Sequence, residues 1–325
     1  MLLSSLVAVL LLAQPYIPDP LPEPQDRPAE TDGDADTREL PWATLAEGIE
    51  HATLVRTQPV LQTVQLLRID LKTPGLEFVL TPANGERELE TDGQTASAFA
   101  SEHGLTAAVN AHFFSPCCAP IEGQAKDLTG LAIADGELVS EHDAESNAND
   151  LVVIEAERGL RASVHEAGSA EVRFARGSLT ISTPRSRRGI DRPRFETIDD
   201  VVVAIAGNRI VVDGKLSDDA AEPRHAAARH PRTAAGVADD GRTLYLVVVD
   251  GRQPGHSLGA TISELAQLMI ELGCEHAINL DGGGSSTMVA SGSPGSLGEA
   301  IVLNQPSAGR ERVNGSHVGV RTAGG

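Results

Sequence analysis

A glycine-rich segment near the C-terminal end constrains the backbone of this chain more than any other feature. The apolar run 277–280 ends at Asp281 and leads directly into the consecutive residues Gly282, Gly283, Gly284 and Ser285. Consecutive glycines cost backbone entropy and pack no side chain, so chains use them for tight turns or close approach to a ligand. A carboxylate beside such backbone suits an oxygen-rich or anionic substrate. The simpler alternative is a glycine turn with an Asx-type hydrogen bond.

Composition favours a soluble, β-rich protein with ample chain for a core. Of the 325 residues, 41% are hydrophobic but only 3% are aromatic, and Gly (32) and Pro (19) are plentiful. This mixture indicates many short strands and turns, with branched aliphatic side chains in the core. The net charge of −20 argues against a nucleic-acid partner, because non-specific binding to nucleic acids requires a basic surface.

The N-terminal residues are predicted to lie outside the folded part. Residues 1–14 contain an uncharged apolar run that is too short for a stable membrane span and resembles the core of a secretory signal peptide, although a basic start is missing. Residues 15–40 are rich in proline and acids, which predicts a disordered linker. We therefore expect a secreted, periplasmic or cell-surface protein.

The chain has too few cysteines for a disulfide scaffold, and it has no C-x-x-C pair for zinc. Cys117 and Cys118 are adjacent, and neighbouring cysteines seldom bond each other because the eight-membered ring is strained. In an exported protein, one of them could instead pair with Cys274. That pairing would leave the third thiol unexplained.

Most of the sequence from residue 41 onward has the pattern of short strands. The pairs Asp135-Gly136 and Asp213-Gly214 lie between apolar runs and predict two-residue hairpin turns, and Asp240-Gly241 repeats the pattern. We interpret the arginine-rich segment 185–194 as an exposed loop. The expected strands include residues 64–71, 76–80, 107–110, 201–205, 210–212 and 244–249, and residues 95–103 are expected to form a short helix.

One further helix is clearly indicated between two strands. The segment from Thr261 to Glu264 fits a capping box, and Gly273 fits a C-terminal stop. The predicted order over residues 244–288 is therefore strand, helix, strand and glycine loop. The apolar face of this helix consists of Leu265, Leu268, Met269 and Leu272.

Two aspartates follow the strands on either side of this helix. Asp250 ends the strand 244–249, and Asp281 ends the next strand in the sequence. If the two strands are neighbours, both carboxylates converge on one cleft, and paired carboxylates suit acid–base cleavage of a glycosidic bond. Their separation, and with it inversion or retention, cannot be read from the sequence. The alternative for Asp250 is an ordinary Asp-Gly turn.

Other polar residues are candidates for substrate contacts. Arg232 and Arg312 could each grip a phosphate with two hydrogen bonds, or form surface ion pairs. Asn110 and His112 could contact sugar hydroxyls or a phosphoryl oxygen, although a lone histidine is more often structural. Glu264 could act as a general acid, but its place in the capping box explains it equally well. The motifs of serine hydrolases, P-loop proteins and dinucleotide-binding folds are missing.

Together these motifs resemble the phosphodiester glycosidase family, which includes the lysosomal "uncovering enzyme", N-acetylglucosamine-1-phosphodiester α-N-acetylglucosaminidase, and many bacterial proteins. The resemblance covers residues 104–321, and residues 41–103 would be an N-terminal β-rich part of the same globular domain. The motifs that carry it, in chain order, are Asn110-Ala-His-Phe-Phe114, Arg232-Thr-Ala-Ala-Gly236, Val248-Val-Asp-Gly-Arg252, Thr261-Ile-Ser-Glu-Leu-Ala266, Asn279-Leu-Asp-Gly-Gly-Gly-Ser-Ser-Thr-Met288 and Asn304-Gln-Pro-Ser-Ala-Gly-Arg-Glu-Arg312.

The resemblance implies a single α+β catalytic domain, with a mixed β-sheet core and packed helices. It implies hydrolysis of an α-N-acetylglucosaminyl-type sugar-1-phosphodiester, which releases the sugar from a phosphomonoester, and a link to envelope or exopolysaccharide metabolism. Two departures from the family pattern, at His112 and at residues 206–209, bear on the sugar subsite. The pocket carried over by the resemblance consists of Asn110, Arg232, Asp250, Asp281, Gly282, Gly283, Gly284 and Ser285.

We expect Arg232, with Arg312 and the glycine amides, to offset the phosphodiester charge while Asp281 and Asp250 orient the sugar and manage the proton. Two alternatives remain open at this point. The pocket could hold an envelope glycan without cutting it. It could also recruit a divalent cation through its acidic loop ends and cleave the P–O bond, and this cation is the one cofactor candidate.

Overall fold

The computed structural model describes residues 40–141, 150–156, 159–165, 171–173, 178–180, 201–222, 228–292 and 299–323. These residues fall within one compact unit that spans residues 32–325. The segment 1–14, most of the linker 15–40 and the arginine-rich segment 185–194 lie outside the described residues. In the described part, no helix is long and apolar enough to cross a membrane.

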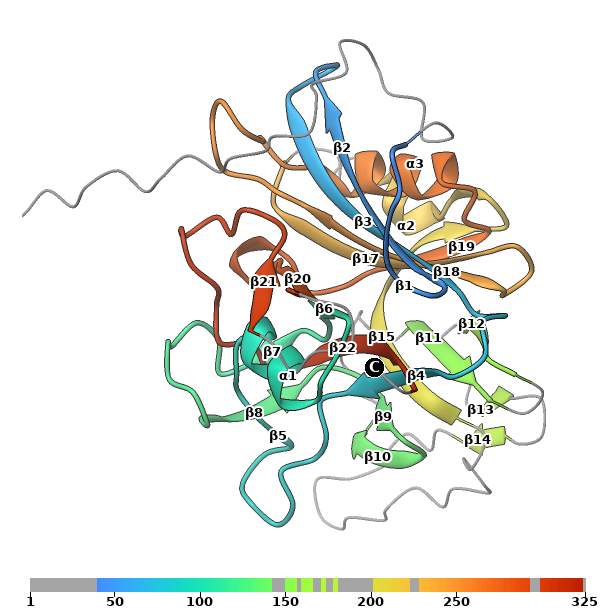
Figure 1. Cartoon of the computed structure of the whole chain (residues 1–325), viewed down its shortest axis with the longest axis vertical. Coiled ribbons are helices and arrows are strands. Elements are labelled where there is room, and N and C mark those ends of the chain that lie inside the picture. The colour runs from blue at the N-terminus through green and yellow to red at the C-terminus, as the bar shows by residue number, and fades with distance from the viewer. Residues whose placement is uncertain are drawn as a thin grey trace, which may run out of the picture. The chain divides into compact units, whose positions relative to one another are not determined.

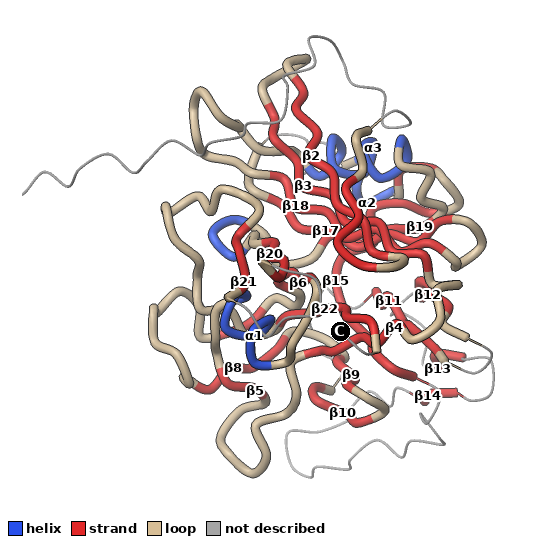
Figure 2. The backbone as a smooth tube through the Cα atoms, viewed as in Figure 1, coloured by secondary structure: helices blue, strands red, loops and turns tan. Residues whose placement is uncertain are grey.

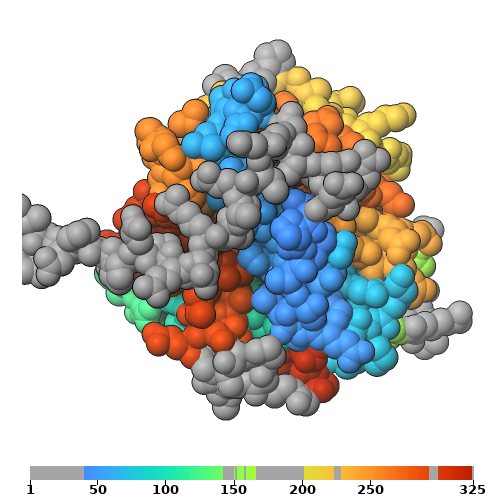
Figure 3. Space-filling model, turned by 45° about the horizontal axis from the view of Figure 1, so that its top comes forward, coloured from blue at the N-terminus to red at the C-terminus, as the bar shows by residue number. Residues whose placement is uncertain are grey.

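A large antiparallel sheet forms the centre of the described unit. Its strands are β1 (Ala43–Ala46), β2 (Ile49–Arg56), β3 (Gln62–Asp70), β9 (Ala132–Ala134), β10 (Glu137–Ser140), β11 (Asp150–Glu155), β12 (Arg161–His165), β15 (Val201–Val212), β16 (Lys215–Leu216), β17 (Arg232–Ala238), β18 (Thr243–Val249) and β19 (His276–Asn279). Its main order is β1-β2-β3-β18-β17-β19-β15-β11-β12, with β9, β10 and β16 off this path. The central strands are nearly continuous runs of buried small and branched residues, as expected for a sheet covered on both faces. The outer strands β1 and β2 (blue) reach the surface (Figure 3).

A second sheet packs against the first. Its strands are β4 (Leu76–Leu80), β6 (Ala107–Asn110), β20 (Met288–Ser291), β21 (Ala300–Val302) and β22 (His317–Thr322), in the order β21-β20-β6-β22-β4. Val248 and Ile278 of the large sheet share one buried cluster with Val109 and Val318 of the smaller sheet. Two small sheets complete the fold, one with β5 (Thr91–Asp92), β7 (Phe114–Ser115) and β8 (Ala125–Leu128), the other with β13 (Glu171–Arg173) and β14 (Ser178–Thr180).

The three described α-helices are short and lie on the outer faces of the two sheets (Figure 1). Helix α3 (Ile262–Glu271) buries Leu265 and Met269 against the large sheet, and α2 (Asp218–Ala221) adds one turn beside it. Helix α1 (Ala96–Glu102) packs Phe99 against the smaller sheet. These positions follow from the apolar stripe that each helix must bury.

The expected α+β class with a mixed sheet is wrong, because the fold is mostly β (Figure 2). Every pairing between described strands is antiparallel. The cause is that the two sheets bury most of each other's apolar surface, so helices are needed only on the outside. Residues 201–205 and 210–212, which were expected as separate strands, form one strand together with the residues between them. Residues 206–209 continue β15, and a Cβ atom at Gly207 would lie 2.5 Å from the Asn279 carbonyl oxygen.

Two of the three hairpin turns predicted from Asp-Gly pairs are confirmed. Asp135 and Gly136 both have positive φ (47° and 73°) between β9 and β10, and Asp213 and Gly214 (49° and 69°) repeat this geometry between β15 and β16. Two successive positive φ angles are the signature of the type I′ turn. The connection from β17 to β18 is longer, although it also includes the predicted Gly241.

The capping box of α3 is confirmed. The Thr261 hydroxyl accepts a hydrogen bond from the Glu264 amide (3.1 Å), and the Glu264 carboxylate accepts one from the Thr261 amide (3.0 Å). The strands that precede Asp250 and Asp281 were expected to be adjacent in the sheet, and this expectation is wrong. Strand β17 lies between β18 and β19 and pairs with both.

Thr261 is buried, so both its hydroxyl and its methyl group can contribute to stability. Two substitutions distinguish the two contributions. Thr261→Ala removes both groups, whereas Thr261→Ser retains the capping oxygen. We expect the alanine variant to be less stable than the serine variant by about 1 kcal/mol, the usual contribution of an N-cap hydroxyl. Urea unfolding of both variants measures this difference, and equal midpoints would show that the cap does not contribute.

Candidate active site

The glycine loop carries the chain from one sheet to the other. Strand β19 belongs to the large sheet, and Asp281, Gly282 and the 3₁₀ turn η2 (Gly283–Ser285) follow it before β20 enters the smaller sheet. Gly283 has a φ of 65°, a region that favours glycine. A Cβ atom at Gly284 would lie 2.2 Å from an Arg312 nitrogen, so a larger residue would displace that guanidinium. The three glycines therefore serve close approach as well as turning.

Asn110, at the end of β6, holds this loop in place. Its Oδ1 accepts hydrogen bonds from the Thr233 hydroxyl (2.8 Å) and the Thr287 amide (3.1 Å), and its Nδ2 donates to the Asp281 carbonyl oxygen (2.6 Å). The Asp281 amide donates in turn to the Ala111 carbonyl oxygen (3.0 Å). Asn110 is only 1% exposed, so in this arrangement it positions Asp281 and does not face a ligand.

The Asp281 side chain is partly buried at the surface end of the loop. Burial raises the pKa of its carboxyl group to about 6. The Ser285 hydroxyl, the Arg312 guanidinium and the Gly282 amide oppose this shift, because each favours the charged carboxylate. A carboxyl group with a pKa in this range can exchange protons near neutral pH, which suits a general acid or base.

Guanidinium groups flank the loop on two sides. Arg312, from the loop between β21 and β22, donates from Nη1 to the Ser285 hydroxyl (3.1 Å). Arg252 lies close to Gly283, because a Cβ atom placed on Gly283 would be 3.3 Å from Arg252 Nη2. Arg232 begins β17 and donates from Nε to the Ala260 carbonyl oxygen (3.0 Å).

These arginines make the region around the loop positively charged. Burial, and then repulsion by Arg252, lower the pKa of Arg232. Burial, and then Arg232 and Arg252, lower the pKa of His230, whose ring lies 3.2 Å from Arg252 Nη2. Within the described part of the chain, no carboxylate lies within 4.0 Å of the guanidinium nitrogens of Arg232, Arg252 or Arg312. Unpaired guanidinium groups beside a glycine loop are suited to a phosphate or phosphodiester.

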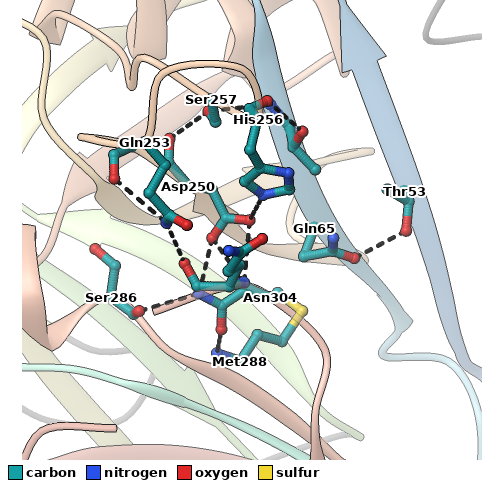
Figure 4. Close-up of polar contacts among 12 residues, drawn as sticks. Thr53, Gln65, Asp250, Gln253, His256, Ser257, Ser286, Met288 and Asn304 are labelled. Atoms are coloured by element: carbon teal, nitrogen blue, oxygen red, sulfur yellow. Dashed lines mark hydrogen bonds and ion pairs between the residues drawn. The ribbon is translucent and has the colours of Figure 1, made fainter. Parts of the chain in front are cut away.

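Asp250 has a different environment from the one predicted. Its carboxylate is 1% exposed and accepts hydrogen bonds from His256 Nε2 (2.8 Å), Asn304 Nδ2 (2.9 Å) and the Gln305 amide (3.0 Å) (Figure 4). Asn304 also donates to the Ser286 carbonyl oxygen (3.2 Å). Asp250 thus fixes the segment that follows the glycine loop, and its hydrogen-bonding capacity is largely used by the protein.

His112 and Glu264 are likewise engaged within the protein. His112 is 1% exposed, and burial lowers its pKa to about 4, so the ring is neutral. Its Nε2 lies 3.0 Å from the Ala206 amide and 3.2 Å from the Leu131 carbonyl oxygen, and its Nδ1 lies 3.0 Å from the Ser316 hydroxyl. The two departures from the family pattern, at His112 and at Ala206, are therefore in direct contact. Glu264 closes its capping box and also pairs with Arg229.

The predicted pairing of Cys274 is wrong. Cys274 is buried with a free thiol, and the adjacent Cys117 and Cys118 are bonded to each other. Arg312 Nη1 donates to the Cys117 sulfur (3.7 Å), so this disulfide lies next to the candidate site. Burial, which favours the neutral thiol, raises the pKa of Cys274 far above its usual range.

The structure thus brings together Asp281, Ser285, Arg312 and the glycine loop, with Arg232 and Arg252 beside them. The prediction missed Arg252 and His230 as candidates, although Arg252 follows Asp250-Gly251 within a recognised motif. Its φ of 62°, uncommon for a residue with a side chain, could not be foreseen from the sequence. Among the described residues, no group of three or more His, Cys, Asp or Glu side chains is arranged to hold a metal ion.

Three solved structures share the fold. A hypothetical protein from Synechocystis aligns with a TM-score of 0.54 and 15% identity, over 85% of this chain and 62% of the other. A putative exported protein from Burkholderia pseudomallei K96243 gives 0.54 and 21%, over 82% and 75%. The catalytic domain of zebrafish N-acetylglucosamine-1-phosphodiester α-N-acetylglucosaminidase, auto-inhibited by its pro-peptide, gives 0.52 and 17%, over 84% and 82%.

Comparison by sequence identifies the family. The SPbeta prophage-derived uncharacterized protein YomE of Bacillus subtilis (strain 168) is 44% identical over 64 residues, which are 20% of this chain and 10% of that relative. The chain therefore matches only about a tenth of the length of this curated relative. The family model of the phosphodiester glycosidases matches residues 103–321, which include every residue of the candidate site. The chain belongs to the phosphodiester glycosidase family.

Proposed function

We propose that this protein hydrolyses a sugar-1-phosphodiester and releases the sugar from a phosphomonoester. The observation that carries the proposal is the partly buried Asp281, with a pKa of about 6, beside Arg312, with Arg252 next to Gly283 of the same loop. A phosphodiester is an anion, whereas the chain as a whole carries a net charge of −20. A local cluster of arginines is therefore what allows such a substrate to bind.

In the proposed complex, Arg312 and Arg252 hold the phosphodiester from the two sides of the glycine loop. Their charge is fixed before the reaction and offsets the charge that develops on the leaving phosphate, with little reorganisation. Arg232 lies close enough to Arg252 to be repelled by it and adds to the positive potential. Because its Nε is bonded to the Ala260 carbonyl oxygen, we assign Arg232 a weaker part in direct contact than the sequence suggested.

The proposed reaction breaks the bond between the anomeric carbon and the phosphate oxygen. The Asp281 carboxylate accepts a proton from a water molecule, the water oxygen bonds to the anomeric carbon, and the electron pair of the broken C–O bond stays on the phosphate. Asn110 and Asp250 act as positioning residues through the hydrogen bonds that fix the loop. This step needs one carboxylate and no covalent intermediate.

For the substrate we propose an α-N-acetylglucosaminyl phosphodiester, because the family is one of phosphodiester glycosidases and the zebrafish enzyme of similar fold is named for this activity. His112 and Ala206, the two departures from the family pattern, hydrogen-bond to each other in the interior. They therefore offer no direct contact that would select against this sugar.

Asp281→Asn should lower turnover by about 10²–10⁴-fold, because the amide cannot take up the proton of the attacking water. The test is hydrolysis of an N-acetylglucosamine-1-phosphodiester in oxygen-18 water, with and without chelator. Label in the sugar is expected. Label in the phosphate, together with loss of activity in chelator, would overturn the mechanism in favour of metal-assisted P–O cleavage.

A matched control for this variant is Asp240→Asn, the same change at the turn between β17 and β18. Asp240 lies roughly 20 Å from Arg232, because the length of strand β17 separates the two residues. The activity of this control should equal that of the wild type. Full activity of Asp281→Asn would remove Asp281 from the mechanism, and thermal unfolding of both variants shows that each is folded.

The pH dependence follows from the raised pKa of Asp281. A carboxylate base is active when deprotonated, so kcat/KM should fall tenfold per unit below about pH 6 and level off above it. Ser285→Ala removes a hydroxyl that favours the charged form, so its midpoint should lie at higher pH than that of the wild type. An unchanged or lower midpoint would contradict the assignment.

We also propose that the protein is secreted, periplasmic or attached to the cell surface, where an envelope glycan or exopolysaccharide would supply the substrate. The apolar run within residues 1–14 and the acidic, proline-rich linker support this location. Fractionation of expressing cells tests it. We expect the protein, shortened at its N-terminus, outside the cytoplasm, and a full-length protein confined to the cytoplasm would contradict the proposal.

A further inference from the structure

A disulfide lies at the rim of the candidate site, and the proposed reaction makes no use of it. Arg312 Nη1 donates both to the Ser285 hydroxyl (3.1 Å) and to the sulfur of Cys117 (3.7 Å), which is bonded to Cys118. One guanidinium nitrogen thus connects the glycine loop to the disulfide. Both cysteines are exposed.

The loop that carries this disulfide is anchored at its base. It connects β7 and β8, and the ammonium group of the buried Lys126 donates to the Pro116 carbonyl oxygen (2.8 Å) and to Gln124 Oε1 (2.9 Å). The Gly123 amide donates to the Gly93 carbonyl oxygen (2.8 Å). These bonds hold both ends of the loop, so the position of the disulfide beside Arg312 is defined by the fold.

The first part of this loop, residues 116–121, contains no charged side chain, and Ile121 is 56% exposed. The exposed Glu122 follows it. Sulfur is polarisable and makes favourable contacts with aromatic rings.

We propose that the Cys117–Cys118 disulfide and Ile121 form an aglycone subsite, which binds a flat apolar face of the group attached to the far side of the phosphate. The inference rests on the proposed function. If Asp281 directs water to the anomeric carbon and Arg312 holds the phosphate, the aglycone continues beyond Arg312. The disulfide is placed to meet it there, because Cys117 Sγ lies 3.7 Å from Arg312 Nη1, the nitrogen that also donates to the Ser285 hydroxyl.

The subsite is tested with two substrates that differ only in the aglycone, the methyl and the p-nitrophenyl esters of α-N-acetylglucosamine-1-phosphate. For the wild type we expect the aryl ester to have the higher kcat/KM, through KM. In Cys117→Ser/Cys118→Ser the ratio of aryl to methyl kcat/KM should fall by roughly five- to tenfold, since an apolar contact is lost. An unchanged ratio, or an equal loss with both esters, would overturn the proposal.

Ile121→Ser provides a second variant that leaves the disulfide intact, and it should lower the same ratio in the same direction. Ile301→Ser is its matched control, because Ile301 is also 56% exposed but lies on β21 in the smaller sheet. We expect the control to retain the wild-type ratio. A fall of equal size in the control would show that exposed isoleucines affect the ratio without contacting the aglycone.

Two measurements separate this inference from the proposed function. Alkylation of the unfolded protein without reductant should modify Cys274 alone, and modification of Cys117 or Cys118 would overturn the subsite. If the wild type hydrolyses neither ester, the proposed function fails, and calorimetry with Asp281→Asn then decides the subsite. If Asp281→Asn binds the aryl ester more tightly than the methyl ester, and this preference is lost when both cysteines are also changed to serine, the subsite proposal stands. Equal binding of the two esters would overturn the subsite proposal.

Discussion

The buried side-chain amide of Asn110 is the interaction on which the rest of the site depends. It stands at the end of a strand in the smaller sheet, accepts a hydrogen bond from Thr233 in the large sheet, and bonds Thr287 and Asp281 on either side of the glycine loop. Losing it would leave several buried groups without a partner, each at a cost of about 1–3 kcal/mol. Asp281 therefore owes its position to both sheets.

The second constraint is electrostatic. Asp250 is satisfied by groups of the protein itself, whereas Asp281 interacts with the Ser285 hydroxyl and the Arg312 guanidinium at the glycine loop. The two carboxylates thus have opposite roles, although they occupy similar places in the sequence. One fixes the loops in place, and the other retains the freedom to exchange a proton.

Much of the local structure could be predicted, because it depends on short-range rules. The capping box at Thr261 and the paired positive φ angles at Asp135 and Asp213 follow from residue types at fixed spacing. The fold class could not, because it depends on how two sheets cover each other. The insertion of β17 between the strands that carry Asp250 and Asp281, and the positive φ of Arg252, are equally non-local results.

The origin of the arginines has a consequence for how the protein responds to heat. Arg232 begins β17 and Arg252 follows β18, both strands of the large sheet, whereas Arg312 comes from a loop of the smaller sheet. In the proposed complex, a substrate held between these arginines contacts residues of both sheets. Warming that loosens the packing between the sheets would increase the distance between these arginines while each sheet keeps its own hydrogen bonds. Loss of activity should therefore precede melting of the secondary structure.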